Sequence, residues 1–352
     1  MDINLDERSK KILQAIVQNY IKTAQPVGSR NIARHYKLGI SPATIRNVMN
    51  DLEELGLIMQ PHTSAGRIPT HKGYRYYVDT LMDRSKLTKQ EEEEIQKNYT
   101  IEKINEFSNE IFHLTSKLLS ESSNCTGVAV SPSISKSIIK RIEFISVSLK
   151  KVLIVLITNS NVIRNKIIEI SSDISSDELH NISNILTDKL YGLTLFQIRE
   201  VFINLINNEM SKSHYVELLK SASIFVKNTL DKEYENDIFL EGTANILQHP
   251  EFSEINKTKE ILKILEEKKN LIKICDKING TNGVKVFIGE ETNILEMQDC
   301  SIVICTYKIE GFPSGTIGII GPTRMKYGKI FSIVEFTSFQ LEKALNNIIK
   351  NQ

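Results

Sequence analysis

One face of an expected helix over residues 41–55 carries side chains that can read the edges of DNA bases. The five residues on this face are Ala43, Thr44, Arg46, Asn47 and Asn50. Arginine can bond guanine with two hydrogen bonds, asparagine can do the same with adenine, and small apolar groups fit the thymine methyl. A structural helix more often exposes Glu and Lys, yet no acid occurs here before Asp51. Base recognition is therefore favoured over a merely solvated face.

The surrounding pattern predicts a helix-turn-helix that positions this face. Asp6 can cap a first helix, whose apolar residues recur at helical spacing and stop before Gly28. A second, short helix begins at Ser29, and a glycine-containing turn follows it. Ser41 is the expected N-cap of the third helix, and Pro42 suits the first helical position.

The next segment has the composition of a wing. Residues 57–59 read as a short strand, and residues 60–69 form a loop whose polar side chains can donate to phosphate or to a minor groove. The residues expected to contact DNA come from the second helix, the third helix and the wing. They are Ser29, Arg30, Ser41, Ala43, Thr44, Arg46, Asn47, Asn50, His62, Thr63, Ser64 and Arg67.

Thr70 is the expected cap of a fourth helix. Its tyrosines fall on one stripe, so we interpret them as packing residues and not as base-stacking platforms. Lys72 and Arg75 are expected to point outward.

The charge distribution agrees with a polyanion partner for the N-terminal part. The 352-residue chain has a net charge of +1, but residues 1–84 hold 12 Lys/Arg against 8 Asp/Glu, whereas the rest holds 32 against 35. Residues 22–50 and 55–78 contain basic residues and no acid. Charge alone leaves a solvated, slightly basic surface equally open.

Composition narrows the class of protein. With 41% hydrophobic and 25% charged residues, the chain is of globular type and long enough for two or three domains. Its longest apolar run, residues 152–157, is far below the ~18 residues that span a bilayer, and the charged N-terminus is unlike a signal peptide, so we expect a cytoplasmic protein without membrane partners. The cysteines form no CxxC pair, which argues against a disulfide framework or a zinc site: Cys125, Cys275, Cys300 and Cys305.

Beyond residue 86 the pattern predicts an α+β domain split in two. Strands rich in Ile and Val are expected between 126 and 170 and again between 284 and 320, with helices at 177–191 and 331–349. Between the halves lie two apolar stripes, within 215–226 and 261–272. Each stripe fits either the core of a small helical domain or an interface between subunits.

A search for catalytic motifs finds no GxSxG, HExxH or GxGxxG, and we predict no catalytic residue, cofactor or metal. The stretch 321–329 misses the spacing of a P-loop and reads as a turn after a core strand. Within it, Arg324 is either a structural ion-pair or cap residue, or a contact for a ligand or chaperonin.

The run SPATIRNVMNDLEELGLI, followed by HTSAGRIPTHKGYRYYVD, resembles the N-terminal signature of the HrcA family of heat-inducible transcription repressors. The resemblance continues at EGTANIL, HPEF and GIIGPTRMKYG. It implies a multidomain α+β protein with a winged helix-turn-helix, a GAF-like α+β domain and a mainly helical dimerising insertion. We expect the limits 1–86 for the winged helix, 87–122 for a linker helix, 123–192 and 283–352 for the GAF-like halves, and 193–282 for the insertion.

The resemblance also implies a homodimer that binds the inverted-repeat operator CIRCE before chaperone operons, at the nucleoid, and that is inactivated by heat and maintained by the GroE chaperonin. The alternatives are a metabolite-responsive regulator with a ligand in the GAF-like domain, and an enzyme that uses this domain as its active site.

Overall fold

The computed structural model describes residues 4–36, 39–63, 65–99, 109–132, 138–159, 163–171, 173–208, 213–236, 238–276, 283–310 and 313–350. Two compact units are present. Unit 1 comprises residues 1–129, 240–306 and 317–352, and unit 2 comprises 130–239 and 307–316. The multidomain α+β class is confirmed. In the described ranges, every helix is too short or too polar to cross a membrane.

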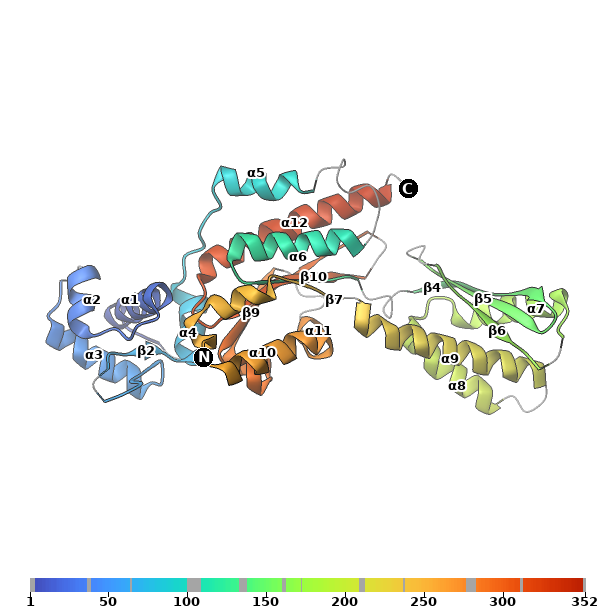
Figure 1. Cartoon of the computed structure of the whole chain (residues 1–352), viewed down its shortest axis with the longest axis horizontal. Helices are drawn as coiled ribbons and strands as arrows, with labels where there is room; N and C mark the ends of the chain where they lie inside the picture. The colour runs from blue at the N-terminus through green and yellow to red at the C-terminus, as the bar shows by residue number, and fades with distance from the viewer. Residues whose placement is uncertain are drawn as a thin grey trace. The chain divides into compact units, whose positions relative to one another are not determined.

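The N-terminal part of unit 1 is a winged helix (Figure 1). Its elements are α1 (Glu7–Thr23), α2 (Ser29–Tyr36), α3 (Pro42–Glu54), β1 (Ile58–Met59), β2 (Ile68–Pro69), α4 (His71–Tyr76) and the π-helical turn η1 (Tyr77–Leu81). Strands β1 and β2 are antiparallel. The predicted caps are confirmed, because the side chains of Asp6, Ser41 and Thr70 each accept a hydrogen bond from a backbone N–H three residues later.

The rest of unit 1 is built on a five-stranded sheet of order β7-β3-β10-β9-β8. Its strands are β3 (Thr126–Val130), β7 (Ile238–Glu241), β8 (Val284–Ile288), β9 (Cys300–Tyr307) and β10 (Gly315–Pro322). The α-helices are α5 (Lys89–Lys97), α6 (Asn109–Ser123), α10 (Ile255–Glu266), α11 (Lys268–Asp276) and α12 (Tyr327–Lys350). Its described residues also form the 3-10 helices η3 (Thr243–Gln248), η4 (Pro250–Phe252), η5 (Gly289–Thr292) and η6 (Leu295–Met297).

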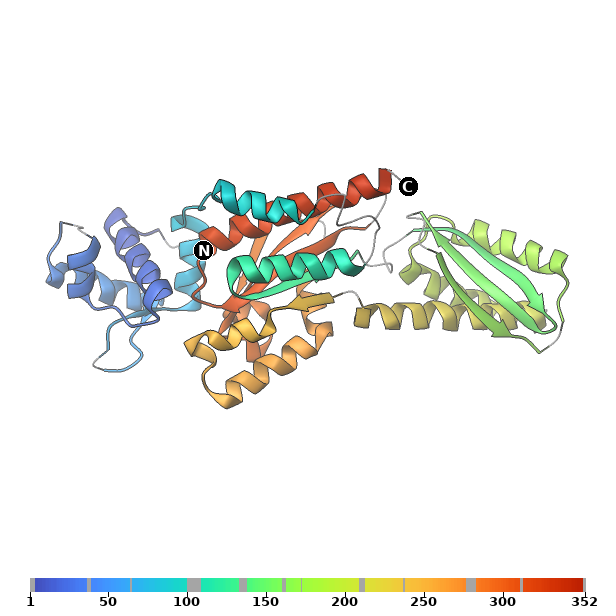
Figure 2. The same cartoon turned by 45° about the horizontal axis from the view of Figure 1, so that its top comes forward.

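Helices α6 and α12 pack against each other, and α6 lies directly on the sheet (Figures 1 and 2). A Cβ atom added to Gly127 in β3 would lie 1.8 Å from the carbonyl oxygen of Ser116 in α6, so this approach requires glycine. In the same sheet, Thr126 at the start of β3 lies 3.5 Å from the carbonyl of Gly242, just beyond β7. Neighbouring strands β3 and β7 therefore run in opposite directions.

Unit 2 has an antiparallel sheet of its own, of order β4-β5-β6. Its elements are β4 (Ile139–Ser148), β5 (Lys151–Thr158), β6 (Ile163–Glu169), α7 (Ser176–Leu190), α8 (Leu195–Asn208) and α9 (Ser213–Asn236). One face of the sheet and all three helices share a single apolar core. The edge strand β4 is covered by α7, where Ser183 Oγ accepts from Phe144 N–H at 2.9 Å and Thr187 Oγ1 accepts from Ile142 N–H at 3.2 Å.

The structure divides the chain differently from the expected limits. Residues 139–190, expected in the first GAF-like half, belong to unit 2 together with α8 and α9. The EGTANIL and HPEF motifs, expected inside the insertion, lie in unit 1 and not in unit 2. The expected linker over 87–122 instead comprises α5 and α6, and α6 is a buried part of the unit 1 core. The alternation of apolar residues predicts that a segment is a strand, but it does not predict which of two sheets the strand joins.

Both apolar stripes that the sequence left open are internal. The residues of the first, on α9, lie in the core of unit 2, and those of the second, on α10 and α11, are buried in unit 1. Both stripes are therefore core residues, as one alternative held, but each lies in a mixed unit of helices and strands and not in a small helical domain.

Candidate nucleic-acid interface

Helix α3 is fixed in place by its cap and by one buried stripe. Ser41 Oγ accepts from Thr44 N–H at 3.1 Å and lies 2.9 Å from Thr44 Oγ1, and Pro42 begins the helix where no N–H donor is needed. The stripe consists of Ile45, Val48, Met49 and Leu52, all buried. Because α1 and α2 pack against α3, the opposite face is left to solvent.

That solvent face holds the predicted base-reading residues. Ala43, Arg46, Asn47 and Asn50 are exposed, whereas Thr44 is half-buried. At the start of α2, Arg30 is also exposed and Ser29 is half-buried. The hydroxyls of Ser41 and Thr44 serve the helix cap, so their local role is structural even though Ser41 is exposed.

The wing is tied to the body of the domain by backbone contacts. Val27 and Arg67 exchange two backbone hydrogen bonds of 2.9 Å. A Cβ atom on Gly66 would lie 2.4 Å from the Val27 carbonyl carbon, so glycine is needed beside this bridge. At the tip, His62 and Thr63 are exposed, and Ser64 lies outside the described residues.

Arg67 is not a free donor at the wing surface. Its side chain is 17% exposed and pairs with Glu53 of α3, with Nη2 2.8 Å from Oε2. The same Nη2 lies 3.5 Å from Asn50 Oδ1. The two residues are 14 positions apart in the sequence, and neither residue type alone indicates that they form a pair.

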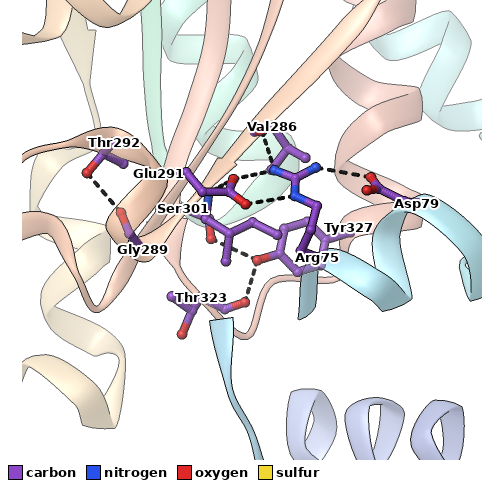
Figure 3. Close-up of polar contacts among 10 residues, drawn as sticks. Arg75, Asp79, Val286, Gly289, Glu291, Thr292, Ser301, Thr323 and Tyr327 are labelled. Atoms are coloured by element: carbon purple, nitrogen blue, oxygen red, sulfur yellow. Dashed lines mark hydrogen bonds and ion pairs between the residues drawn. The ribbon is translucent and has the colours of Figure 1, made fainter. Parts of the chain in front are cut away.

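Arg75 was expected to point outward, and the structure corrects this. Its guanidinium is held by Glu291 of η5, donates to the Val286 carbonyl of β8 at 2.8 Å, and donates to Asp79 at 3.1 Å (Figure 3). Nearby, a Cβ on Gly289 would lie 2.6 Å from the His71 ring. Arg75 therefore joins the winged helix to the five-stranded core.

A second joint involves Arg324, for which the ion-pair alternative is correct. Its guanidinium pairs with Glu251, and Nη1 donates to the Ile21 carbonyl of α1 at 3.4 Å. The arginine side chain is 13% exposed and the glutamate 19% exposed. A further ion pair lies outside the winged helix. It joins Lys329 of α12 to Glu91 of α5, whose side chain also belongs to the capping box with Thr88.

The acidic, histidine and cysteine side chains bear on metal binding and on thiol chemistry. Among them, no group of three or more His, Cys, Asp or Glu side chains is placed to hold a metal ion. The four cysteines are buried and are not joined by disulfides. Burial raises the pKa of the Cys125 thiol to about 11, which leaves it protonated and unreactive near neutral pH.

Comparisons with known proteins cover both parts of the chain. Residues 4–81 match the family "Winged helix-turn-helix transcription repressor, HrcA DNA-binding", and residues 109–331 match "HrcA protein C terminal domain". The "Heat-inducible transcription repressor HrcA" of Desulfitobacterium hafniense is 41% identical over 97% of this chain and 98% of its own length. The protein of the same name from Pelotomaculum thermopropionicum is 40% identical over 99% of each chain.

A solved structure described as a hypothetical protein at 2.2 Å resolution covers 98% of this chain and 100% of its own, with 22% identity and a TM-score of 0.56. It supports the fold. The relatives are DNA-binding transcription repressors and not enzymes. With family matches over both parts and full-length relatives at about 40% identity, the chain belongs to the HrcA family of heat-inducible transcription repressors.

Proposed function

We propose that this chain represses chaperone operons by binding the inverted-repeat operator CIRCE as a homodimer. The observation that carries the proposal is the exposed face of α3, where Arg46, Asn47 and Asn50 stand on a helix that is buried on its other side. These side chains suit base edges in a major groove. We propose that the exposed residues Arg30, His62 and Thr63 contact the DNA backbone beside these bases. The bound repressor lies at the nucleoid, in the cytoplasm.

A homodimer is proposed because one chain carries one α3 and an inverted repeat offers two half-sites. The outer face of the unit 2 sheet supports a subunit contact. Ile145, Ile163 and Ile167 on this face are 45%, 56% and 55% exposed, and they lie on the edge strands β4 and β6, each of which pairs with β5. Exposed apolar rows of this kind are typical of protein contacts. We expect Ile167→Lys to weaken the dimer, as measured by sedimentation equilibrium.

Heat inactivation and dependence on GroE are proposed from the way the core is assembled. Strands β3 and β7 are neighbours in one sheet but are separated along the chain by most of unit 2. Contacts between such distant segments form late in folding, which exposes apolar strands to aggregation meanwhile. A chaperonin that assists refolding would then set the amount of active repressor.

The test is a binding titration with a labelled duplex carrying the inverted repeat, followed by fluorescence anisotropy through a heating and cooling cycle. We expect discrimination against a scrambled duplex, loss of binding on heating, and recovery that needs GroE and ATP. Equal affinity for scrambled DNA would refute operator recognition. Full recovery without chaperonin would refute the role of GroE, and a metabolite that changes operator affinity would favour the ligand-responsive alternative.

A further inference from the structure

We infer that Arg67 is a positioning residue for base recognition, which holds the Asn50 amide and the wing through Glu53, and that it is not a phosphate ligand. The inference rests on the DNA recognition in the proposed function. It replaces the expectation from sequence that this arginine acts at the wing surface.

The contacts form a chain from the base-reading helix to the wing. Glu53 and Asn50 are three residues apart on α3 and so lie on the same side of the helix. Glu53 receives Arg67 Nη2 at 2.8 Å through Oε2 and Gln60 N–H at 3.1 Å through Oε1. Gln60 Nε2 in turn donates to the carbonyls of Thr63 at 2.9 Å and Ala65 at 3.0 Å. The Glu53 carboxylate therefore joins α3 to the wing loop.

The burial of Arg67 argues against a direct role on the DNA backbone. Its side chain is 17% exposed, and its Nε is fully shielded from solvent. A phosphate would have to compete with a carboxylate already 2.8 Å away. Because Glu53 neutralises the guanidinium in the free protein, binding DNA gains little counterion release from this arginine.

The consequence appears at Asn50. Arg67 Nη2 faces Asn50 Oδ1 at 3.5 Å, so the amide oxygen turns toward the arginine and the amide NH2 turns away from it. An exposed Asn50 oriented in this way offers donors, which match acceptors such as guanine O6 and N7 or thymine O4. Without Arg67 the amide is free to flip, and the base preference at its position should weaken.

The experiment uses the full chain and a set of inverted-repeat duplexes in which each base pair of a half-site is replaced in turn. Asn50→Ala first identifies the base pair that depends on Asn50. We expect Arg67→Ala and Glu53→Gln to weaken the preference at that same base pair by about 5- to 10-fold, within the range of one base contact. Preferences at other base pairs should stay within about twofold, and Asn50→Ala combined with Arg67→Ala should add no further loss there.

The dependence of affinity on salt separates the two roles. If Arg67 positions Asn50, the slope of log affinity against log salt stays within about 0.3 of the wild-type value for Arg67→Ala. If Arg67 binds phosphate, Arg67→Ala lowers the slope by about one, and Glu53→Gln frees the cation and tightens all duplexes. Arg67→Lys keeps the charge, so it retains binding in the phosphate role and loses base preference in the positioning role.

Glu7→Gln is the matched control, because it removes another glutamate ion pair, with Lys10 at 2.8 Å on α1. It should leave base preference unchanged. Thermal unfolding checks that each variant folds. If Arg67→Ala is unstable, Glu53→Gln and Arg67→Lys still test the inference. A uniform loss over all duplexes overturns the inference while operator recognition stands, whereas a wild-type chain that cannot discriminate its operator overturns the proposed function itself.

Discussion

Replacing Arg75 with alanine should loosen the joint between the winged helix and the five-stranded core. The guanidinium bonds Glu291, the Val286 carbonyl and Asp79, and its side chain is 20% exposed. Hydrogen bonds to charged groups contribute about 1.5 to 3 kcal/mol when buried. Because the Glu291 side chain is 34% exposed, solvent screening reduces this, and we expect a coupling between Arg75 and Glu291 of about 1 to 2 kcal/mol.

Hydrogen exchange measured by mass spectrometry is a suitable assay, because a chain of two units need not unfold in one step. The Ile288 N–H donates to Glu291 Oε2 at 2.9 Å, so a peptide covering residues 284–292 reports on the joint. At 1.4 kcal/mol for each tenfold change, the expected coupling corresponds to about 5- to 30-fold faster exchange. A double-mutant cycle of Arg75→Ala with Glu291→Gln isolates the pairwise part.

Arg84→Ala provides the control for this cycle. Arg84 pairs with Glu335 at 3.2 Å, but both side chains are more than half exposed, so loss of this ion pair should cost under about 0.5 kcal/mol. Equal effects of Arg75→Ala and Arg84→Ala, or additive effects of Arg75→Ala and Glu291→Gln, would refute the argument that burial makes the Arg75 joint strong.

Three further outcomes are expected. Arg46→Ala and Asn47→Ala should each reduce discrimination between operator and mutated operator by about 1 to 3 kcal/mol in binding titrations, and equal losses on random DNA would reassign them to backbone contact. Gly73→Ala should shift thermal unfolding downward, because its Cβ would lie 1.9 Å from the Leu57 carbonyl oxygen; an unchanged melting temperature would show that α4 can move away. Burial lowers the pKa of His249 from its ordinary value of 6.5. Just below pH 6.5, His249 is therefore protonated to a greater extent in the unfolded chain than in the folded chain. Stability should therefore fall as pH drops through 6.5, and His249→Gln should flatten this dependence in urea titrations at pH 7.5 and 5.5, unless NMR titration places the pKa of His249 above 6.5.

Patterns among residues close in sequence predicted the helices of the winged helix. A helix cap involves residues three apart, so Ser41 and Thr70 could be recognised from the sequence and are found as caps. The exposed face of α3 follows from helical periodicity in the same way. Tyr74 and Tyr77 are buried, as their helical spacing indicates, and Tyr76, which lies off that stripe, is buried as well.

Contacts across long distances in sequence could not be predicted. Arg75 meets Glu291, 216 residues away, and Arg324 meets Glu251, 73 residues away. An arginine on an apparently polar helix face looks the same whether it meets water or a distant carboxylate. Arg67 is a related case, because its place in the wing suggests a phosphate contact, whereas its ion pair with Glu53 is seen only in the structure.

The antiparallel pairing of β3 and β7 has a consequence for the way unit 2 is connected to the five-stranded sheet. Unit 2 departs after β3 and the chain returns at β7, and these strands lie side by side. Topologically, the two strands are the arms of a hairpin in which a folded unit stands in the place of the loop. Such a site accepts an inserted domain without changing the strand order of its host. A shortened chain in which a few glycine and serine residues replace 131–237 therefore keeps both arms of that hairpin.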